Sequence, residues 1–215
     1  MSKYEVPGGE DEQFEPGSNR TVLKNKLGIT SPDAMAVAKT DALLDAQAGA
    51  VEWFEDTRRL SAEVVRRLHR EWLGKIYDFA GEYRQVNMSK ADILLCAAPY
   101  IADQMKQLET HLFAKFTPCK GIAFDDLCER IARIHAELLL IHPFREGNGR
   151  LARWIAGLMA MQAGKPTPKY YIERSDLDAK RQEYFAALRK GYFDQDVADL
   201  KLLFASWIRD AERNA

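Results

Sequence analysis

The segment His142-Pro143-Phe144-Arg145-Glu146-Gly147-Asn148-Gly149-Arg150 lies between two apolar stretches and is the feature from which the expected fold follows. Apolar residues recur along one helix face before it, at Leu127, Ile131, Ile134 and Leu138. Pro143 stops that helix from continuing cleanly. A second helix is expected immediately afterwards, over about 149–163. The sequence therefore predicts a helix, a short polar loop and another helix in direct succession.

Most of the remaining apolar patterns are also typical of helices. Helical spacing and capping signals predict further helices over 31–48, 61–78, 100–116, 176–190 and 196–212. Gly49 is expected to interrupt or end the first of these. Residues 86–95 are the exception, because they suggest a short hairpin with Ser89-Lys90-Ala91-Asp92 at its polar tip. The predicted fold class is all-α, a helical bundle with one small β-hairpin.

The domain organisation is expected to be simple. Residues 1–20 hold prolines and glycines among acidic residues, which favours an irregular N-terminal arm. The remaining pattern extends over 21–212, and a chain of 215 residues is long enough for one well-cored domain but short for two. We therefore expect an arm followed by a single domain.

Composition and charge restrict the class of partner and compartment. Hydrophobic residues make up 47% and charged residues 29%, which argues against global disorder. The formal net charge of −1 gives no support for nucleic acid or an anionic membrane surface as a partner. No apolar run approaches the roughly 20 residues that span a bilayer. Three cysteines without a CxxC pair and the lack of a secretory signal favour a cytoplasmic protein.

The loop after His142 has the composition of an anion site. Gly147 and Gly149 flank Asn148, so the backbone can adopt positive φ and turn successive amides inward. A helix begins at once, and its N-terminal amides favour a bound phosphate. Arg150 and Arg153 are three residues apart and can share a helix face. Arginine is suited to bidentate contact with phosphate.

Two residues of the same loop have the chemistry of a reaction centre. A neutral imidazole at His142 can take a proton from an attacking hydroxyl group. Glu146 would be repelled by a polyphosphate unless a cation joined them, and Mg²⁺ takes one or two carboxylates together with phosphate oxygens. The loop therefore predicts phosphoryl or nucleotidyl transfer.

Residues 142–153 resemble the complete signature of the Fic family, HxFx[D/E]GNGRxxR, with every fixed position matched and no gap. Ala80-Gly81-Glu82-Tyr83-Arg84 resembles the family's AGxxR segment, and Leu68-His69 resembles the helix before it. Leu23-Lys24-Asn25-Lys26-Leu27 is similar to the opening of Fic toxins. The resemblance covers about residues 20–205.

The resemblance implies a role for each matching residue. The protein would be an adenylyltransferase that moves AMP from ATP to a Ser, Thr or Tyr hydroxyl of a target protein, with His142 as the base. Phe144 would anchor the loop in the core, and Glu146 would hold Mg²⁺. The phosphate-binding residues would be Gly147, Asn148, Gly149, Arg150 and Arg153.

The resemblance also implies where the target protein docks. The hairpin over 86–95 would be the family's flap, which aligns the target backbone as an added strand. Its docking residues would be Met88, Ser89, Lys90, Ile93 and Leu95, some of which can equally be packing residues. Tyr184 is a candidate contact for the nucleotide base, because it lies on a helix that follows the catalytic pair. His69 and His135 are expected to be structural.

Two other functions stay open for a sequence of this kind. Doc toxins share the fold but act as protein kinases, and their motif has Lys where this chain has Gly149, so AMP transfer is favoured. A non-catalytic nucleotide-binding module is the other alternative, and the presence of His142 argues against it. The sequence does not exclude a nucleotide donor other than ATP.

Regulation is expected to come from a separate protein. Many members of the resembled family carry an inhibitory [S/T]xxxE[G/N] helix, whose glutamate pairs with the second motif arginine. No Ser or Thr here has Glu four residues later; the nearest approach is Ser206 with Asp210. A small antitoxin that supplies the inhibitory Glu to Arg153 is therefore expected, with this chain as the toxin of the pair.

Overall fold

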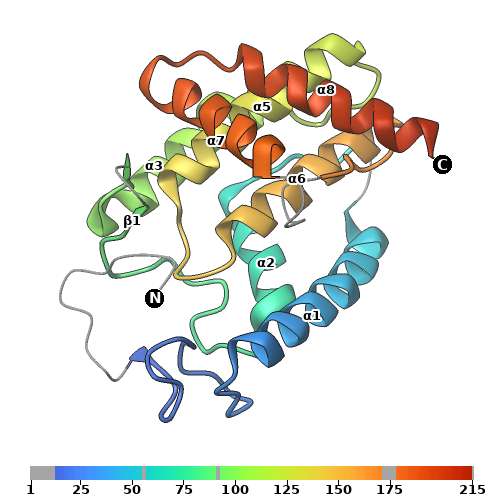
Figure 1. Ribbon diagram of the computed structural model, residues 1–215. Coiled ribbons are helices and arrows are strands. Elements are labelled where there is room, and N and C mark those ends of the chain that lie inside the picture. Colours follow the sequence, from blue (N-terminus) through green and yellow to red (C-terminus); the bar gives the residue numbers. More distant parts are fainter. Residues whose placement is uncertain (1–12, 55–56, 91–92, 171–177, 215) are drawn as a thin grey trace. The chain divides into compact units, whose positions relative to one another are not determined.

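The computed structural model describes residues 13–54, 57–90, 93–170 and 178–214. Their regular structure is helical apart from one two-stranded sheet and an isolated bridge (Figure 1). The predicted all-α class with a small hairpin is confirmed. The chain forms two compact units, which are described separately below. The first comprises Met1–Trp53, Ser61–Lys106 and Ile141–Asn148, and the second comprises Phe54–Leu60, Gln107–Leu140 and Gly149–Ala215.

The first unit is built around the helices α1 (Pro32–Trp53) and α2 (Ala62–Leu73), which pack side by side (Figure 1). Ser61 caps α2, because its hydroxyl accepts a hydrogen bond from the Val64 amide at 3.1 Å. The buried Trp72 joins the pair by donating from Nε1 to the Lys39 carbonyl at 2.8 Å. The expectation that Gly49 interrupts or ends α1 is wrong, because one helical glycine costs only about 1 kcal/mol and packing on α2 offsets it.

The predicted hairpin forms in the first unit. Strands β1 (Ser89–Lys90) and β2 (Ile93–Leu94) are antiparallel, with Ser89 opposite Leu94 and Lys90 opposite Ile93. Ala91 and Asp92, expected at its polar tip, lie outside the described residues. The hairpin has its own apolar cluster of Met88 and Leu95, with Val86 and Ile93 packed against it.

Residues on the two sides of the boundary predicted at residue 20, between arm and domain, contact each other. Phe14 forms an isolated bridge with Leu23, and the Glu15 carboxylate accepts a hydrogen bond from the Asn25 amide at 3.0 Å. Residues 1–12 of the predicted arm lie outside the described part of the chain. Residues 13–20 are thus paired with the residues that follow them.

One predicted helix, 100–116, is divided into several pieces. It begins with the 3-10 turn η2 (Ala98–Tyr100) and the helix α3 (Ile101–Leu108). A π-helical segment, η3 (Glu109–Phe113), and the short α4 (Ala114–Phe116) complete it. A π-segment inserts an extra residue into the helical ladder, which apolar periodicity does not reveal.

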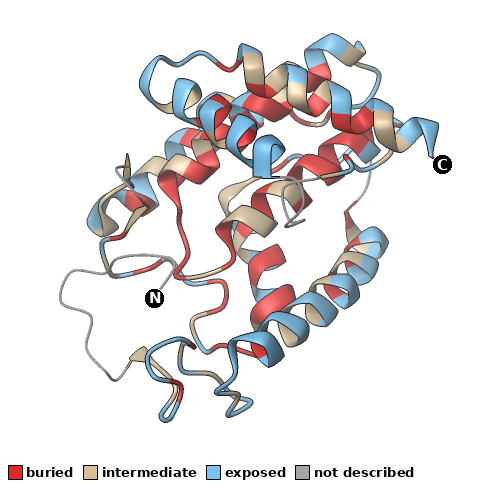
Figure 2. Cartoon of the chain, viewed as in Figure 1, coloured by how far each residue is buried: buried red, intermediate tan, exposed pale blue. Residues whose placement is uncertain are grey.

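The long helices of the second unit are α5 (Phe124–Ile141), α6 (Asn148–Gln162), α7 (Asp178–Phe193) and α8 (Ala198–Arg213). Helix α6 is buried over most of its length (Figure 2), as expected of a central helix that is apolar on several faces. The first residues of the helix predicted over 176–190 lie outside the described residues. Helices α7 and α8 pack together through buried side chains, among them Tyr184, Leu188, Phe204 and Trp207.

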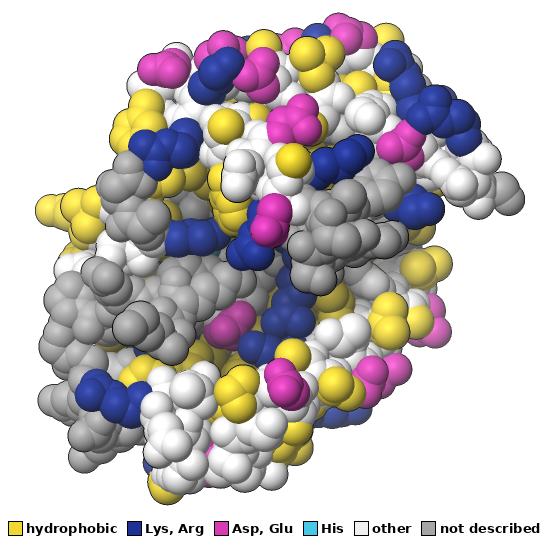
Figure 3. All heavy atoms as spheres, in the orientation of Figure 1, with side chains coloured by type: hydrophobic (Ala, Val, Ile, Leu, Met, Phe, Trp, Pro, Cys, Tyr) yellow, Lys and Arg dark blue, Asp and Glu magenta, His cyan; other side chains and the backbone are white. Residues whose placement is uncertain are grey.

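Charged side chains of both signs are interspersed over α7 and α8 (Figure 3). An example is the ion pair between Lys190 of α7 and Asp199 of α8. Among the described residues, no helix is both long enough and apolar enough to cross a membrane.

Candidate active site

His142 follows the last residue of α5 and has an unusual backbone conformation. Its φ is +51°, in the left-handed region that non-glycine residues adopt rarely. Pro143 contributes to this, because a proline disfavours the right-handed helical conformation of the residue before it. The His142 side chain is buried, with 3% of the residue exposed. The proposed base is thus placed by a sharp break at the end of α5.

The loop after His142 is held together by Phe144 and Asn148. Phe144 is fully buried, as the core-anchor role requires. The Asn148 side chain accepts a hydrogen bond from the Phe144 amide at 2.9 Å and donates one to the Phe144 carbonyl at 2.7 Å. The Asn148 side chain therefore closes the loop on itself through both main-chain groups of Phe144.

Gly147 sits where no other residue fits. Its φ is +85°, and a Cβ atom there would lie 2.8 Å from Cζ3 of Trp72 and 3.2 Å from Cδ1 of Leu73. Both constraints exclude a side chain. The Gly147 backbone thus packs directly against the Trp72 and Leu73 side chains of α2.

Glu146 has two neighbours that compensate its charge. Its Oε1 accepts a hydrogen bond from the Gly147 amide at 2.8 Å, and Nζ of Lys39 lies 3.5 Å from its Oε2. The carboxylate is partly exposed, with 21% of the side chain accessible. The described residues contain no group of three or more His, Cys, Asp or Glu that could hold a metal ion. A cation here would rest on Glu146 and on ligand oxygens, which is how Mg²⁺ binds with nucleotide phosphates.

His69 of α2 supports the loop through a hydrogen bond to the main chain of Glu146. Its Nδ1 accepts a hydrogen bond from the Gly81 amide at 2.8 Å, which places the ring proton on Nε2. Nε2 lies 3.0 Å from the Glu146 carbonyl oxygen and donates to it. A structural role was expected for His69, and its hydrogen bonds show that it supports the loop itself.

The two predicted phosphate arginines lie in the first turns of α6. Arg150 and Arg153 are both partly exposed, and the first turn contains no acidic residue. The Arg153 guanidinium lies 5.6 Å from the centre of the Tyr170 ring, and the Tyr170 hydroxyl donates to the Arg153 carbonyl at 3.1 Å. Cations at a helix N-terminus oppose the helix dipole, so a bound anion would relieve the repulsion.

Tyr184, the candidate base contact, is buried in an aromatic cluster of the second unit. Its hydroxyl oxygen lies 2.8 Å from Nε2 of His135, and Phe204 and Trp207 pack around the pair. Burial raises the pKa of Tyr184, with the nearby Arg153 opposing this, and burial lowers the pKa of His135 to about 3. The Tyr184 hydroxyl therefore stays protonated and the His135 ring neutral, and the two groups share this hydrogen bond.

The hairpin presents its predicted docking residues unequally. Met88 and Leu95 are buried, at 1% and 5% exposure, whereas Ser89, Lys90 and Ile93 are partly exposed. Leu94, which the sequence did not single out, is the most exposed of the described hairpin residues at 79%. Alternation along the strand is the signal that points to it.

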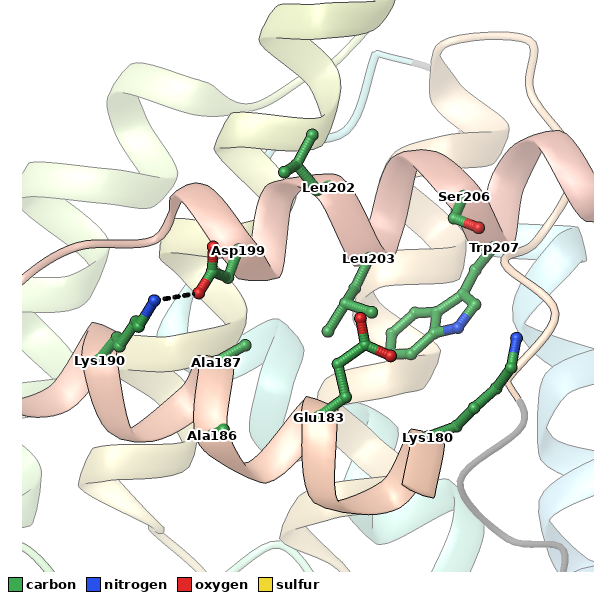
Figure 4. Close-up of a pocket in the computed structure, with 10 residues that line it drawn as sticks. All are labelled: Lys180, Glu183, Ala186, Ala187, Lys190, Asp199, Leu202, Leu203, Ser206 and Trp207. Carbon is green, nitrogen blue, oxygen red and sulfur yellow. Dashed lines mark hydrogen bonds and ion pairs between the residues drawn. The ribbon is translucent and has the colours of Figure 1, made fainter. Parts of the chain in front are cut away.

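A separate pocket of about 500 Å³ lies between α7 and α8, with Trp207 on one wall and the pair Lys190 and Asp199 at one end (Figure 4). None of the ten residues that line it is a site residue predicted from the sequence. It is therefore distinct from the loop residues described above.

The predicted site residues fall into two groups by unit. His142, Glu146, Gly147 and Asn148 belong to the first unit, together with the hairpin. Gly149, Arg150, Arg153 and Tyr184 belong to the second. The division falls between consecutive residues in the first turn of α6, so the chain itself joins the loop to the arginines.

A helical domain with a histidine, a carboxylate and two arginines carried by one helix–loop–helix segment has the construction of a nucleotidyltransferase. Residues 59–160 match the Fic/DOC family model, a stretch that includes the signature at 142–153. The family predicted from the signature at 142–153 is thereby confirmed.

Similar proteins agree with this assignment. The chain is 29% identical over 160 residues to the probable protein adenylyltransferase Fic of Salmonella typhimurium, covering 73% of this chain and 75% of the relative. The N-terminal FIC domain of Bep8 from Bartonella sp. 1-1C has the same fold, with a TM-score of 0.77 at 18% identity over 96% of this chain and 99% of that one. BepC of Bartonella tribocorum, whose crystal structure contains AMPPNP, gives a TM-score of 0.70 at 22% identity over 93% and 98%. The predicted enzyme class, nucleotidyltransferase, is confirmed at this level.

Proposed function

We propose that the protein transfers AMP from ATP to a Ser, Thr or Tyr hydroxyl of a target protein. The observation that carries this proposal is the position of His142, at the break between α5 and the Gly147 loop that leads into α6. A base beside an anion-binding loop is what the attack of a hydroxyl group on a phosphate requires.

In the proposed reaction His142 accepts the proton of the target hydroxyl. The hydroxyl oxygen forms a bond to the α-phosphorus of ATP, and the bond between that phosphorus and the bridging oxygen to the β-phosphate breaks. Pyrophosphate leaves, and the target carries AMP. Positioning of the reactants, together with neutralisation of the phosphate charge, lowers the barrier to this transfer.

The phosphates are assigned to main-chain and guanidinium donors. The amides of Gly147, Asn148 and Gly149 would bind the α- and β-phosphates, and Arg150 and Arg153 would bind the β- and γ-phosphates. Glu146 is assigned the Mg²⁺ ion, which neutralises phosphate charge when bound. Lys39 and the Gly147 amide contact the Glu146 carboxylate, so a cation there would compete with Lys39 for the same oxygens.

The target is assigned to the hairpin. The short antiparallel pair with an exposed Leu94 offers main-chain groups and an apolar side chain to an added strand. AMP transfer is supported by relatives that are named protein adenylyltransferases. The AMPPNP bound in the BepC crystal structure supports ATP as the type of donor.

A toxin–antitoxin role is the finer part of the proposal. It is supported by the sequence, which has no inhibitory glutamate motif of its own. A small antitoxin would insert a glutamate opposite Arg153 and exclude the γ-phosphate by pairing with that guanidinium. Purified protein should then be active by itself, without an activating mutation in the same chain.

The test is transfer of ³²P from ATP labelled at the α-phosphate, with Mg²⁺, into proteins of a bacterial lysate. Wild-type protein is compared with His142→Ala and with His111→Ala, a matched change at an exposed histidine. AMP transfer predicts a labelled band that His142→Ala loses and His111→Ala keeps. Label that arrives only from the γ-phosphate, and depends on His142, would instead make the protein a kinase. Absence of both, with nucleotide bound, would leave a non-catalytic module.

A further inference from the structure

Arg84 is a buried residue of the segment between α2 and the hairpin. It is 3% exposed, and its Nε donates to the His142 carbonyl at 2.8 Å. Nη2 donates to the Ile141 carbonyl at 3.3 Å. These carbonyls belong to the C-terminal end of α5, where helix formation leaves acceptors without intrahelical partners. The Arg84 guanidinium therefore supplies the cap that ends α5.

The same guanidinium reaches both ends of the hairpin. Nη1 donates to the Val86 carbonyl at 2.5 Å, and Nη2 donates to the Cys96 carbonyl. Val86 precedes β1 and Cys96 follows β2. Within the part of the chain that the structure describes, the side chain thus donates to main-chain oxygens at the C-terminal end of α5 and on both sides of the hairpin.

The Arg84 main chain adds a further contact. Its amide donates to the Pro143 carbonyl at 2.9 Å, so His142 is held on both sides by one residue. His142 has φ +51°, and a non-glycine residue keeps such a conformation only where its surroundings impose it.

We propose that Arg84 is a positioning residue, which holds His142 in its left-handed conformation and ties it to both ends of the hairpin. Its consequence for catalysis rests on the proposed function, in which the hairpin docks the target and His142 takes the target's proton. Docking and proton transfer would then be aligned through one side chain, without Arg84 touching the substrate.

The chemistry of the site requires arginine and not merely a cation. The guanidinium carries its donors in a planar fork, so it can reach acceptors on three segments at once, whereas the Lys ammonium offers three donors from one atom. Burial lowers the pKa of Arg84, yet the group stays charged at physiological pH because that pKa starts very high. A positive charge at the end of α5 is also favourable with the helix dipole.

The test compares Arg84→Lys with Arg66→Lys in the full chain. Arg66 is a matched control, since its Nε also donates to a main-chain carbonyl, that of Gly81 at 2.8 Å. Its Nη atoms donate to the Glu63 and Glu82 carboxylates, which belong to neither the hairpin nor the loop. NMR of protein labelled at histidine follows the His142 ring, assigned with His142→Ala. Amide exchange follows the Leu95 N–H, which donates to the Met88 carbonyl at 3.3 Å.

Arg84→Lys should shift the His142 ring signals and speed exchange at Leu95 by about ten-fold, while Arg66→Lys changes neither. In the transfer assay kcat should fall by roughly 100-fold with KM for the target raised and KM for ATP unchanged. Unchanged ring signals and exchange in a folded Arg84→Lys protein would overturn the proposal. If these change while wild-type protein transfers no label, the positioning role stands and the proposed function fails.

Met88→Ala keeps the test decisive if Arg84→Lys does not fold. It loosens the hairpin's apolar cluster and leaves Arg84 in place. Coupling through Arg84 predicts that the His142 ring signals shift together with faster Leu95 exchange. Faster exchange at Leu95 with an unmoved His142 ring would mean that no such coupling exists.

Discussion

The imidazole ring of His69 stacks on the ring of Phe144, with 3.9 Å between their centroids and 11° between their planes. The stack joins α2 to the core anchor of the loop, and the same imidazole holds the Glu146 carbonyl. Burial in this position lowers the pKa of His69 to about 4, from an ordinary value of 6.5, with the Glu146 backbone contact opposing the shift.

The buried histidines predict how stability depends on pH. The folded-state pKa values of His69 and His135, about 4 and about 3, lie below the unfolded value of 6.5. The unfolded chain therefore binds more protons in this range, and stability falls as pH drops from about 6.5 towards 4. The loss from each histidine is on the order of 3 kcal/mol if it acts alone.

Thermal unfolding at pH 7.5, 6.5, 5.5 and 4.5 measures this effect. His135→Gln should flatten the profile relative to the wild type, whereas His111→Gln, at an exposed position, should leave it unchanged. If lowering the pH reduces the Tm of the wild type no more than it reduces the Tm of His135→Gln, the buried His135 ring does not resist protonation.

Replacing Lys39 should alter the response to Mg²⁺. Lys39 lies 3.5 Å from the Glu146 carboxylate and competes with any cation there. Lys39→Met should lower the Mg²⁺ concentration needed for half-maximal nucleotide binding, by a few-fold, because like charges repel at short range. Titration calorimetry with Mg²⁺ and a non-hydrolysable ATP analogue measures it directly.

Lys26→Met is the control for the Lys39 variant. Lys26 also pairs with a carboxylate, that of Asp78 at 3.2 Å, but Asp78 is 93% exposed in its side chain and carries no predicted role. Its Mg²⁺ response should match the wild type. If Lys39→Met and the wild type respond equally to Mg²⁺, then either Glu146 does not bind the cation or Lys39 does not compete with it.

Gly147→Ala should be strongly destabilising. The new methyl would lie 2.8 Å from Trp72 in a backbone conformation with φ +85°, and overpacking together with strain costs about 2–4 kcal/mol. Gly28→Ala is the matched change, because Gly28 has φ +64° with nothing within 4 Å of the added Cβ. It should cost only the backbone penalty of about 1 kcal/mol.

Chemical denaturation of the two glycine variants separates these contributions. Equal losses in free energy of unfolding would contradict the close approach of the loop to α2. A larger loss in Gly147→Ala, accompanied by loss of nucleotide binding, is the expected result.

Tyr184→Phe distinguishes a core role from a base-contact role. Removing the hydroxyl leaves His135 Nε2 without its hydrogen-bond partner at 2.8 Å, which should cost about 1 kcal/mol of stability. If Tyr184 acts in the core alone, KM for ATP stays at the wild-type value. A raised KM with unchanged stability would instead assign the residue to the nucleotide base.

Features that depend on residues close together in the sequence were predicted correctly, and features that depend on distant residues were not. Apolar spacing located α2, α5 and α8, because each has one face against a core. It did not show that Gly49 lies inside α1 or that η3 interrupts a helix, since neither feature changes the local apolar pattern. The hairpin was found from its alternation, but the exposure of Leu94 was not.

The sequence by itself determined the loop between α5 and α6. A proline after the histidine, glycines around Asn148 and arginines in the next helical turns act over a few residues, where backbone conformation and spacing follow from residue type. Those same local constraints identified the family through a contiguous signature.

Only the tertiary structure decided what holds that loop in place. Arg84 is 58 residues from His142 and His69 is 77 residues from Glu146, and Lys39 belongs to yet another helix. Their contacts depend on how α1, α2 and the hairpin pack, and residue type does not specify a partner so distant in the chain. Buried polar groups must find partners, but packing alone determines which carbonyl or carboxylate each one meets.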